Sequence, residues 1–491
     1  MDRAEAEGIW EAGRERCVEV ILELAGAVEQ LRSRGERLEE RVGCLEEQSR
    51  RDSRNSSSPP SQDPPKTRAE RRAQARKKAK AWSKREGEKR EQGAQPGHEG
   101  SGRKLLGEDQ MQEIHHHYPQ ACGGCGREFS EQEKRPAERF GRHQVAELPP
   151  ISVIYFEHRT HHLPCPGCGK RTAGRLPVGV TGSPFGMGVH AAVVTLTARI
   201  RVSRRDMPEL ARELFGLGLS VGTVDAICQR ACVALEGPHQ ALAAKVLSSP
   251  VLNIDETGWY TAHEQRTMWT ASTPEAAIFR ICSDRHRDRL EELIGKDFSG
   301  IVGSDRWWAY ELFDPEQRQA CWEHLKRDFF KHSEGLAEQK EFGTAGLALT
   351  KRLFKTWHAF EEHQDRARLI TEIAAIKAEL QTLLEHAARK SPRTKYHRRF
   401  ANNLLKIWPA LWTFVTIEGV QPTNNAAERS LRGPVIYRKL SHGTQSEKGE
   451  QFIERALSVS VTCRLQARSM FTYMHGLLTA HARGDPLPTL A

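Results

Sequence analysis

The stretch that organises this chain is Val251-Leu252-Asn253-Ile254-Asp255-Glu256. Its β-branched and apolar residues predict a strand over residues 251–254 that ends at the two acids. The following sequence predicts strands over 268–271 and 277–282, a helix over 288–294, and a fourth strand over 301–304 that ends at Asp305. Residues 318–322 are a candidate fifth strand.

Three strands, a helix and then further strands is the order of the ribonuclease-H-like fold. The first and fourth strands are neighbours in that fold, so the carboxylates of Asp255 and Asp305 can share metal ions. Two-metal phosphoryl transfer needs such a cluster, because the ions clamp the attacking and leaving oxygens. The pattern therefore predicts a metal-dependent catalytic site.

A third acid is expected from a later helix, and the strongest candidate is Glu428. Asn424 or Asn425 can cap that helix, which places Glu428 in its first turn. Four cations suited to holding phosphate follow: Arg429, Arg432, Arg438 and Lys439. Each acid taken alone would be an ordinary exposed carboxylate, and their joint placement carries the prediction.

Two helical regions flank these motifs. A helical insertion over about residues 335–415 separates Asp305 from Glu428, and its amphipathic helix is marked by Leu369, Ile370, Ile373, Ile376, Leu380 and Leu383. Upstream, residues 207–215 and 221–235 predict two helices, the second capped by Ser220. That pair suits a DNA-binding helix-turn-helix and equally suits any helical hairpin.

Two C-x-x-C pairs predict a zinc-binding domain over residues 104–180. Each pair is followed by a glycine that permits a tight turn, and together they supply four thiolates for one tetrahedral structural Zn²⁺: Cys122, Cys125, Cys165 and Cys168. Residues 153–156 between them have strand character. The alternative is four reduced surface thiols.

The N-terminal region predicts self-association and DNA binding. Leucines recur every seven residues at Leu24, Leu31, Leu38 and Leu45, with Ile21, Val28, Gly35 and Val42 three residues before each. This heptad predicts a coiled coil and a homodimer or larger assembly; the alternative is one amphipathic helix packed on its own chain. A linker rich in Pro and Ser follows it.

The basic residues are concentrated in one arm. Residues 66–90 contain twelve Lys or Arg, among them Arg71, Arg72, Lys77 and Lys78, against three acids, so the arm supplies nine of the chain's net charge of +10. Clustered cations of this kind release DNA counterions, which predicts phosphate contacts. A solvated helix is the alternative.

Composition excludes two classes of protein. The 491 residues contain no apolar run near the roughly 20 needed to span a membrane. The start of the chain lacks the basic and apolar regions of a signal peptide. Eleven cysteines without an export signal indicate reduced thiols plus a metal site. A membrane protein and a secreted disulfide scaffold are therefore excluded, and a bacterial cytoplasmic protein, nucleoid-associated when bound to DNA, is expected.

The chain resembles the transposases of the insertion sequence 66 family, a branch of the DDE transposases. The resemblance runs nearly from end to end through the zipper, the linker, Gln95-Pro96-Gly97-His98 and the cysteine pairs. It continues through Asp255-Glu256-Thr257-Gly258-Trp259, Ser304-Asp305-Arg306-Trp307-Trp308, Cys321-Trp322-Glu323-His324 and Asn424-Asn425-Ala426-Ala427-Glu428-Arg429. The shared order of these short motifs is what makes the resemblance specific.

The resemblance implies that Asp255, Asp305 and Glu428 are catalytic acids that hold two Mg²⁺ or Mn²⁺ ions. It implies double-stranded DNA partners, namely element ends and target, and accessory element-encoded proteins. Cys321 and His324 match a C-x-x-H signature of related transposases, with a structural or DNA-contacting role left open. A ribonuclease-H-like nuclease without strand transfer, and a zinc-containing DNA-binding regulator with vestigial acids, are the alternatives.

The expected architecture is an α+β multidomain chain. Its predicted parts are a coiled coil (1–50), a basic disordered linker (51–103), a zinc ribbon-like domain (104–180), a helix-turn-helix-like segment (181–245), a ribonuclease-H-like catalytic domain with the helical insertion (246–445) and a C-terminal helical segment (446–491).

Overall fold

The computed structural model describes residues 105–134, 141–149, 151–335, 337–391 and 394–490, together with isolated positions between residues 10 and 34. The chain forms two compact units, one of Met1–Pro64 with Ile154–Ala491 and one of Pro65–Val153. The predicted zipper leucines and the basic arm, including Arg71, Arg72, Lys77 and Lys78, lie outside the described residues.

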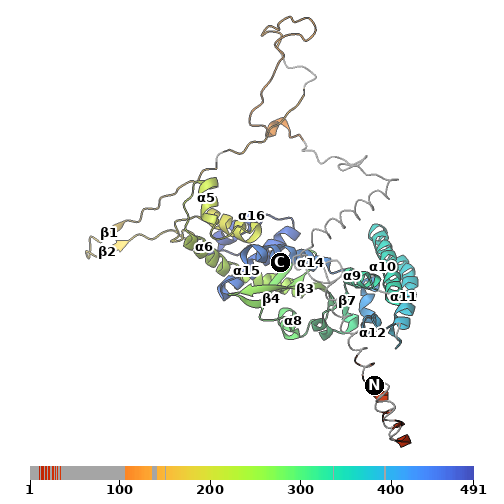
Figure 1. Cartoon of the computed structure of the whole chain (residues 1–491). Coiled ribbons are helices and arrows are strands. Elements are labelled where there is room, and N and C mark those ends of the chain that lie inside the picture. Colours follow the sequence, from red (N-terminus) through yellow and green to blue (C-terminus); the bar gives the residue numbers. More distant parts are fainter. Residues whose placement is uncertain are drawn as a thin grey trace. The chain divides into compact units, whose positions relative to one another are not determined.

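A five-stranded mixed sheet lies at the centre of the first unit (Figure 1). Its strand order is β5-β4-β3-β6-β7. The strands are β3 (Val251–Thr261), β4 (Glu264–Ser272), β5 (Ala277–Cys282), β6 (Ile301–Ser304) and β7 (Arg318–Ala320). Strand β4 pairs antiparallel with both β3 and β5. On the other side of β3, β6 pairs with it in parallel, and β7 pairs with β6 in parallel.

The predicted strands are confirmed, with corrections to the bounds of three of them. Strand β4 extends beyond the predicted residues 268–271 at both ends. Strand β3 continues to Thr261, so Asp255 and Glu256 lie inside it and not at its end. Its second half pairs with β4 in a register that joins Gly258 to Thr267, and Thr261 also forms a bridge with Thr444. Strand β7 stops at Ala320, because Trp322 begins the next helix.

One face of the sheet is covered by α7 (Glu236–Leu247) and α8 (Arg287–Ile294). Leu252 and Ile254 of β3 and Val302 of β6 are fully buried in the resulting apolar cluster, which also contains Tyr310. Helix α8 connects β5 to β6 and so allows the change from antiparallel to parallel pairing.

Helix α15 (Glu447–Leu465) covers the edge of the sheet formed by β5. The backbone N–H groups of Ala277 and Phe279 donate to the hydroxyls of Thr462 (3.1 Å) and Ser458 (3.0 Å), and that of Ile281 donates to the Glu454 carboxylate. A rise of about 6 Å per four helical residues matches about 6.6 Å per two strand residues. Side chains four apart on α15 therefore satisfy alternate donors of edge strand β5.

The region expected as a helical insertion, about residues 335–415, contains α10 (Ala337–His363), α11 (Arg366–Ala388), α12 (Arg398–Lys406) and most of α13 (Thr413–Thr416). Helix α9 (Trp322–Ser333) precedes this region. Leu369, Ile373, Ile376 and Leu380 of α11 are buried as predicted, but Ile370 is 45% exposed. A Cβ at Gly346 of α10 would lie 2.0 Å from the Phe329 ring, so glycine permits the close approach of α9 and α10.

The remaining helices pack together across the sequence. They are α4 (Met187–Thr195), α5 (Met207–Phe215), α6 (Val221–Ala234), α14 (Asn425–Ser441) and α16 (Met470–Arg483), and a π-helical turn follows α4 at Leu196–Ile200. The predicted helical pair is confirmed as α5 and α6, and Ser220 accepts a hydrogen bond from the Thr223 N–H at 3.1 Å as its cap. Helices α4 and α6 precede the sheet in the sequence, and they contact α15 and α16, which follow it. Segments from before and after the sheet therefore share a core.

The strand expected over residues 153–156 is not formed. Ile154, Tyr155 and Phe156 are between 74% and 81% exposed and have no regular secondary structure. Strand pairing in this region begins later, with β1 (His162–Pro164) antiparallel to β2 (Arg171–Ala173). A run of β-branched and aromatic residues is not sufficient to form a strand, because a strand also needs a pairing partner and a covered face.

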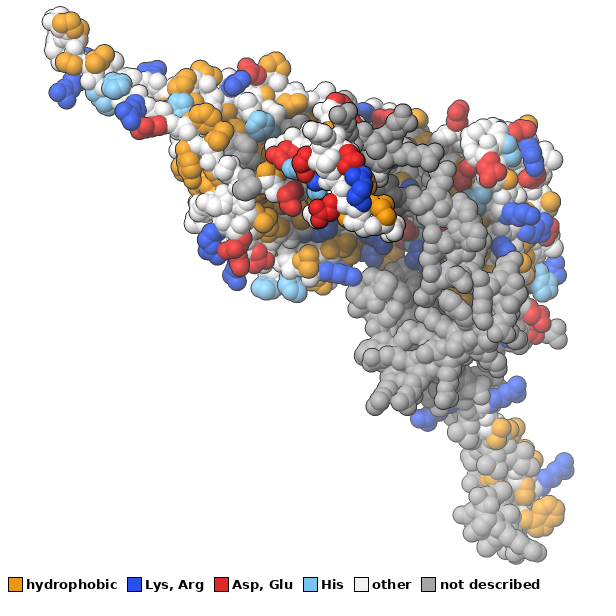
Figure 2. Space-filling view, turned by 90° about the horizontal axis from the view of Figure 1, so that it is seen from above, with side chains coloured by type: hydrophobic (Ala, Val, Ile, Leu, Met, Phe, Trp, Pro, Cys, Tyr) orange, Lys and Arg blue, Asp and Glu red, His pale blue; other side chains and the backbone are white. Residues whose placement is uncertain are grey.

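No helix within the described residues is both long and apolar enough to cross a membrane. On the face drawn in Figure 2, Lys and Arg side chains intermingle with Asp and Glu side chains. This distribution agrees with a charge surplus that lies mainly in the arm at residues 66–90.

Candidate catalytic site

The register of β3 and β6 brings two of the predicted acids together. Leu252 pairs with Val302 and Asn253 with Gly303. Continuing this register by two residues places Asp255 opposite Asp305, which directly follows β6. The Trp307 backbone N–H donates to Asp305 Oδ1 at 2.8 Å and so fixes the orientation of that carboxylate.

A buried asparagine brings the third acid to the same place. Asn424 is fully buried immediately before α14, and its side-chain amide donates to the carbonyl of Ile254 at 2.8 Å. Asn424 or Asn425 was predicted to cap α14; Asn424 is the N-cap residue, but its side chain makes no capping hydrogen bond. The amide instead ties the start of α14 to β3, which positions Glu428, one helical turn later, near Asp255.

Electrostatics show that the carboxylates are close enough to repel one another. The pKa of Asp255 is raised well above its ordinary value by burial first, and then by Glu256, Asp305 and Glu428. Burial also raises the pKa of Asp305 and of Glu428. Carboxylates arranged against their own repulsion are typical of a cation site, because a cation offsets both the burial and the repulsion.

Glu256 is a fourth acid, and because it directly follows Asp255 in β3, its side chain lies on the opposite face of the strand. It shares the side of Leu252 and Ile254, and its side chain is 4% exposed. The Tyr310 hydroxyl donates to it at 2.7 Å, and Arg285 pairs with it. Burial first and then Asp305 raise the pKa of Glu256, so this acid interacts with the cluster.

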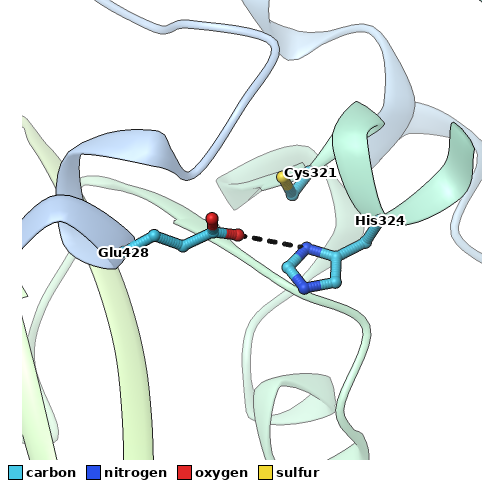
Figure 3. A group of neighbouring side chains, drawn as sticks. All are labelled: Cys321, His324 and Glu428. Atoms are coloured by element: carbon cyan, nitrogen blue, oxygen red, sulfur yellow. Dashed lines mark ion pairs between the residues drawn. The ribbon is translucent and has the colours of Figure 1, made fainter. Parts of the chain in front are cut away.

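Glu428 lies within a second group of side chains (Figure 3). Its Oε1 is 3.8 Å from His324 Nδ1 and 3.4 Å from Arg327 Nη2. The ligand atoms of Cys321, His324 and Glu428 all lie within 4.8 Å of one another. Burial lowers the pKa of His324 to about 3 and raises that of Cys321 to about 11, so both side chains are uncharged at neutral pH.

The predicted cations of α14 have different environments. Arg429, Arg432 and Lys439 are exposed. Arg438 donates instead to the Gly258 carbonyl and to the Thr257 hydroxyl at 3.3 Å. Arg438 therefore fastens α14 to β3, a role that the sequence did not reveal.

A groove of about 660 Å³ runs between α9, α10 and the start of α14, and Arg429, the residue after Glu428, lines it together with Lys326, Lys351 and Lys355. Two carboxylates, those of Glu323 and Glu361, also line the groove. The four cations leave a surplus of positive charge that suits a phosphate backbone.

The two C-x-x-C pairs form matching turns, each within its own unit. In the first, the Cys122 N–H donates to the Arg127 carbonyl and the Gly126 N–H to the Cys122 carbonyl; in the second, Cys165 and Gly169 repeat the pattern with Lys170. Gly126 and Gly169 have φ of +76° and +71°, which glycine adopts readily. Backbone N–H groups in each turn lower the pKa of Cys122 and Cys165, which favours the thiolate.

The donor sets fit two kinds of metal. Asp255, Asp305 and Glu428 offer only carboxylate oxygens, which suit Mg²⁺ or Mn²⁺. The cysteine turns offer sulfur, which suits Zn²⁺. The described cysteines all have free thiols, so the four cysteines of these turns form no disulfide.

The fold and site define a mixed α/β protein whose central sheet presents a cluster of carboxylates. The sequence profile described as "Transposase IS66 family" matches residues 182–452, more than half of the chain. The chain therefore belongs to the IS66 transposase family.

Two further similarities are found. Residues 10–104 match a family of unknown function, DUF6444. "Uncharacterized protein y4qI" of Sinorhizobium fredii is 25% identical over 240 residues, which are 46% of this chain and 44% of that protein. The matched region thus spans less than half of that relative's length.

Proposed function

We propose that this chain is a DDE transposase that binds the terminal inverted repeats of an insertion sequence, cleaves at the element ends and joins them to target DNA. The observation that carries the proposal is the convergence of Asp255, Asp305 and Glu428, which come from two adjacent parallel strands and a tethered helix. The mutual effect of these acids, which lie far apart in the sequence, on the pKa of Asp255 supports the proposal.

The sheet supports a ribonuclease-H-like assignment of the catalytic domain. With the strands counted from β3 as the first, the order across the sheet is third, second, first, fourth, fifth, and a helix stands between the third and fourth. The first two acids lie on the first strand and directly after the fourth, as that fold requires.

Each side chain has a proposed role in the chemistry. Asp255, Asp305 and Glu428 would hold two Mg²⁺ ions, which would supply activation of the attacking oxygen and stabilisation of the leaving oxygen. The backbone N–H of Trp307 orients Asp305, and Asn424 holds the Glu428 helix against β3. Water is the nucleophile in the first step, and the freed 3′-hydroxyl of the element is the nucleophile in the second.

DNA binding is assigned to separate cationic surfaces. The groove lined by Lys326, Lys351 and Lys355 reaches Arg429, the residue after Glu428, and suits the strand that is cut. The arm at residues 66–90 supplies contacts that tolerate any sequence, because phosphates carry no base identity. Self-association through the heptad at residues 9–48 brings two element ends together.

The test is reconstitution with the full-length chain. Double-stranded DNA carrying the inverted repeats that flank the gene is incubated with protein, Mg²⁺ and a target plasmid. We expect cuts that expose 3′-hydroxyls at the element ends, followed by joined products. Cuts without joined products would support the nuclease alternative. End binding without any cut would support the regulator.

A further inference from the structure

Cys321, His324 and Glu428 form a group whose chemistry differs from that of the oxygen-only cluster beside it. Within the described parts of the chain, this group brings three metal-ligating side chains together, with ligand atoms no more than 4.8 Å apart. A sulfur, an imidazole nitrogen and a carboxylate oxygen are ligands that Zn²⁺ and Co²⁺ accept and that Mg²⁺ does not prefer.

Local structure prepares two of the ligands. Cys321 is the N-cap residue of α9 and His324 lies in its first turn, so both side chains lie over the same helix end. The Asn424 backbone N–H donates to Cys321 Sγ at 3.2 Å. A hydrogen bond to sulfur and a helix N-terminus both stabilise a thiolate.

The third side chain completes a neutral site with a route to solvent. His324 Nδ1 is buried and has no hydrogen-bond partner among the described residues, and it faces Glu428 Oε1 at 3.8 Å (Figure 3). One thiolate and one carboxylate balance the charge of a divalent ion, which suits a sulfur that is fully buried. The Glu428 side chain is 34% exposed and leaves an approach from solvent.

We propose that Cys321, His324 and Glu428 form a binding site for a thiophilic divalent ion such as Zn²⁺, and that its occupancy withdraws Glu428 from the magnesium cluster. The Cys321 thiol loses its proton to solvent on binding, and the ion takes its place. The site would make the enzyme sensitive to zinc. This second part rests on the proposed function, whereas the ion-binding part does not.

The test uses Co²⁺ as a coloured probe on the purified full-length chain after its metals have been removed with a chelator. One equivalent of Zn²⁺ is returned first, so that the four thiolates of the cysteine turns take it up and the Cys321 group is free for Co²⁺. Bound Co²⁺ should give thiolate-to-cobalt charge-transfer absorption in the wild type. Cys321→Ser should abolish that absorption, and His324→Gln should weaken Co²⁺ binding by at least about ten-fold, since losing a ligand costs no less than losing an outer partner. Cys463→Ser is the matched control, because Cys463 is equally buried and burial raises its pKa to about 11 as well.

The possible outcomes separate this inference from the proposed function. Equal absorption in all variants would mean that Co²⁺ binds elsewhere, and no absorption in the folded wild type would mean that the group is only a packing and positioning network; either result overturns the site. Cleavage in Mg²⁺ is then measured with added Zn²⁺, and we expect inhibition of the wild type and of Cys463→Ser. Co²⁺ binding without any cleavage would leave the ion site standing and reject the transposase proposal.

Discussion

The side-chain amide of Asn424 donates a 2.8 Å hydrogen bond to the carbonyl of Ile254. Asn424 immediately precedes the helix that carries Glu428, and Ile254 immediately precedes Asp255 in its strand. One buried hydrogen bond therefore sets the distance between two acids that lie far apart in the sequence. The same asparagine donates its backbone N–H to Cys321 Sγ, so it also fixes the start of α9.

Asn424→Ala should reduce cleavage without abolishing DNA binding. The change leaves the Ile254 carbonyl without its partner, which costs about 1–3 kcal/mol of stability. A shift of roughly 1 Å in Glu428 can lower the rate about 100-fold. Single-turnover cleavage and thermal unfolding measure the two effects. Asn425→Ala is the matched control, and equal rates for the two variants would show that the tether has no role in positioning.

Asp255→Asn should stabilise the protein in Mg²⁺-free buffer at pH 8. The folded state raises the pKa of Asp255, so the folded protein binds this proton more tightly than the unfolded chain does. Stability from this group is therefore lost as the pH rises from the ordinary pKa through the raised one. We expect a gain of about 2–4 °C in Tm at pH 8, and a smaller gain as the pH is lowered, because the wild-type carboxyl then becomes protonated. A variant that melts below the wild type at pH 8 would contradict the repulsion.

Cys122→Ser and Cys165→Ser should each remove one zinc ion per chain, measured by elemental analysis. One ion shared by four thiolates predicts that the double variant loses no more than either single variant. Cys463→Ser should retain all its zinc. Additive losses would mean that each C-x-x-C turn binds its own ion.

Ser458→Ala should destabilise the catalytic unit by about 1–3 kcal/mol, because the buried Phe279 N–H loses its acceptor at the sheet edge. Thr382→Ala is the control, since that exposed hydroxyl bonds only to the Ala378 carbonyl of its own helix. Denaturant unfolding measures both variants. Equal midpoints would show that water can replace the α15 hydroxyl at this edge.

Local patterns were sufficient to predict most of the sheet. The β-branched runs at residues 277–282 and 301–304 correspond to β5 and β6, and the asparagines before Glu428 correctly predicted its place in the first turn of a helix. These features depend on neighbours in the sequence, which is why a single sequence reveals them.

Tertiary contacts account for what the sequence did not predict. Strand β3 continues through Gly258 to Thr261 because β4 pairs with it along that length, against the low strand preference of glycine. The exposed residues 154–156 have good strand preference but no partner. Three contacts were not predicted: the Asn424 hydrogen bond to β3, the Arg438 hydrogen bond to β3 and the pairing of buried Glu256 with Arg285. Each one joins residues that are far apart in the sequence, so local sequence periodicity cannot predict it.

The most direct measurement compares metal-dependent cleavage at the element ends by Asp255→Asn, Asp305→Asn and Glu428→Gln with cleavage by two matched controls. Asp314→Asn and Glu447→Gln are the controls, because Asp314 is an exposed acid soon after Asp305 and Glu447 is an exposed acid in the first turn of α15. We predict that each of the three cluster variants loses cleavage by orders of magnitude while retaining end binding, since a two-metal site fails when one ligand is lost. The controls should cleave like the wild type. Cleavage at wild-type rates by any of the three cluster variants would contradict the account.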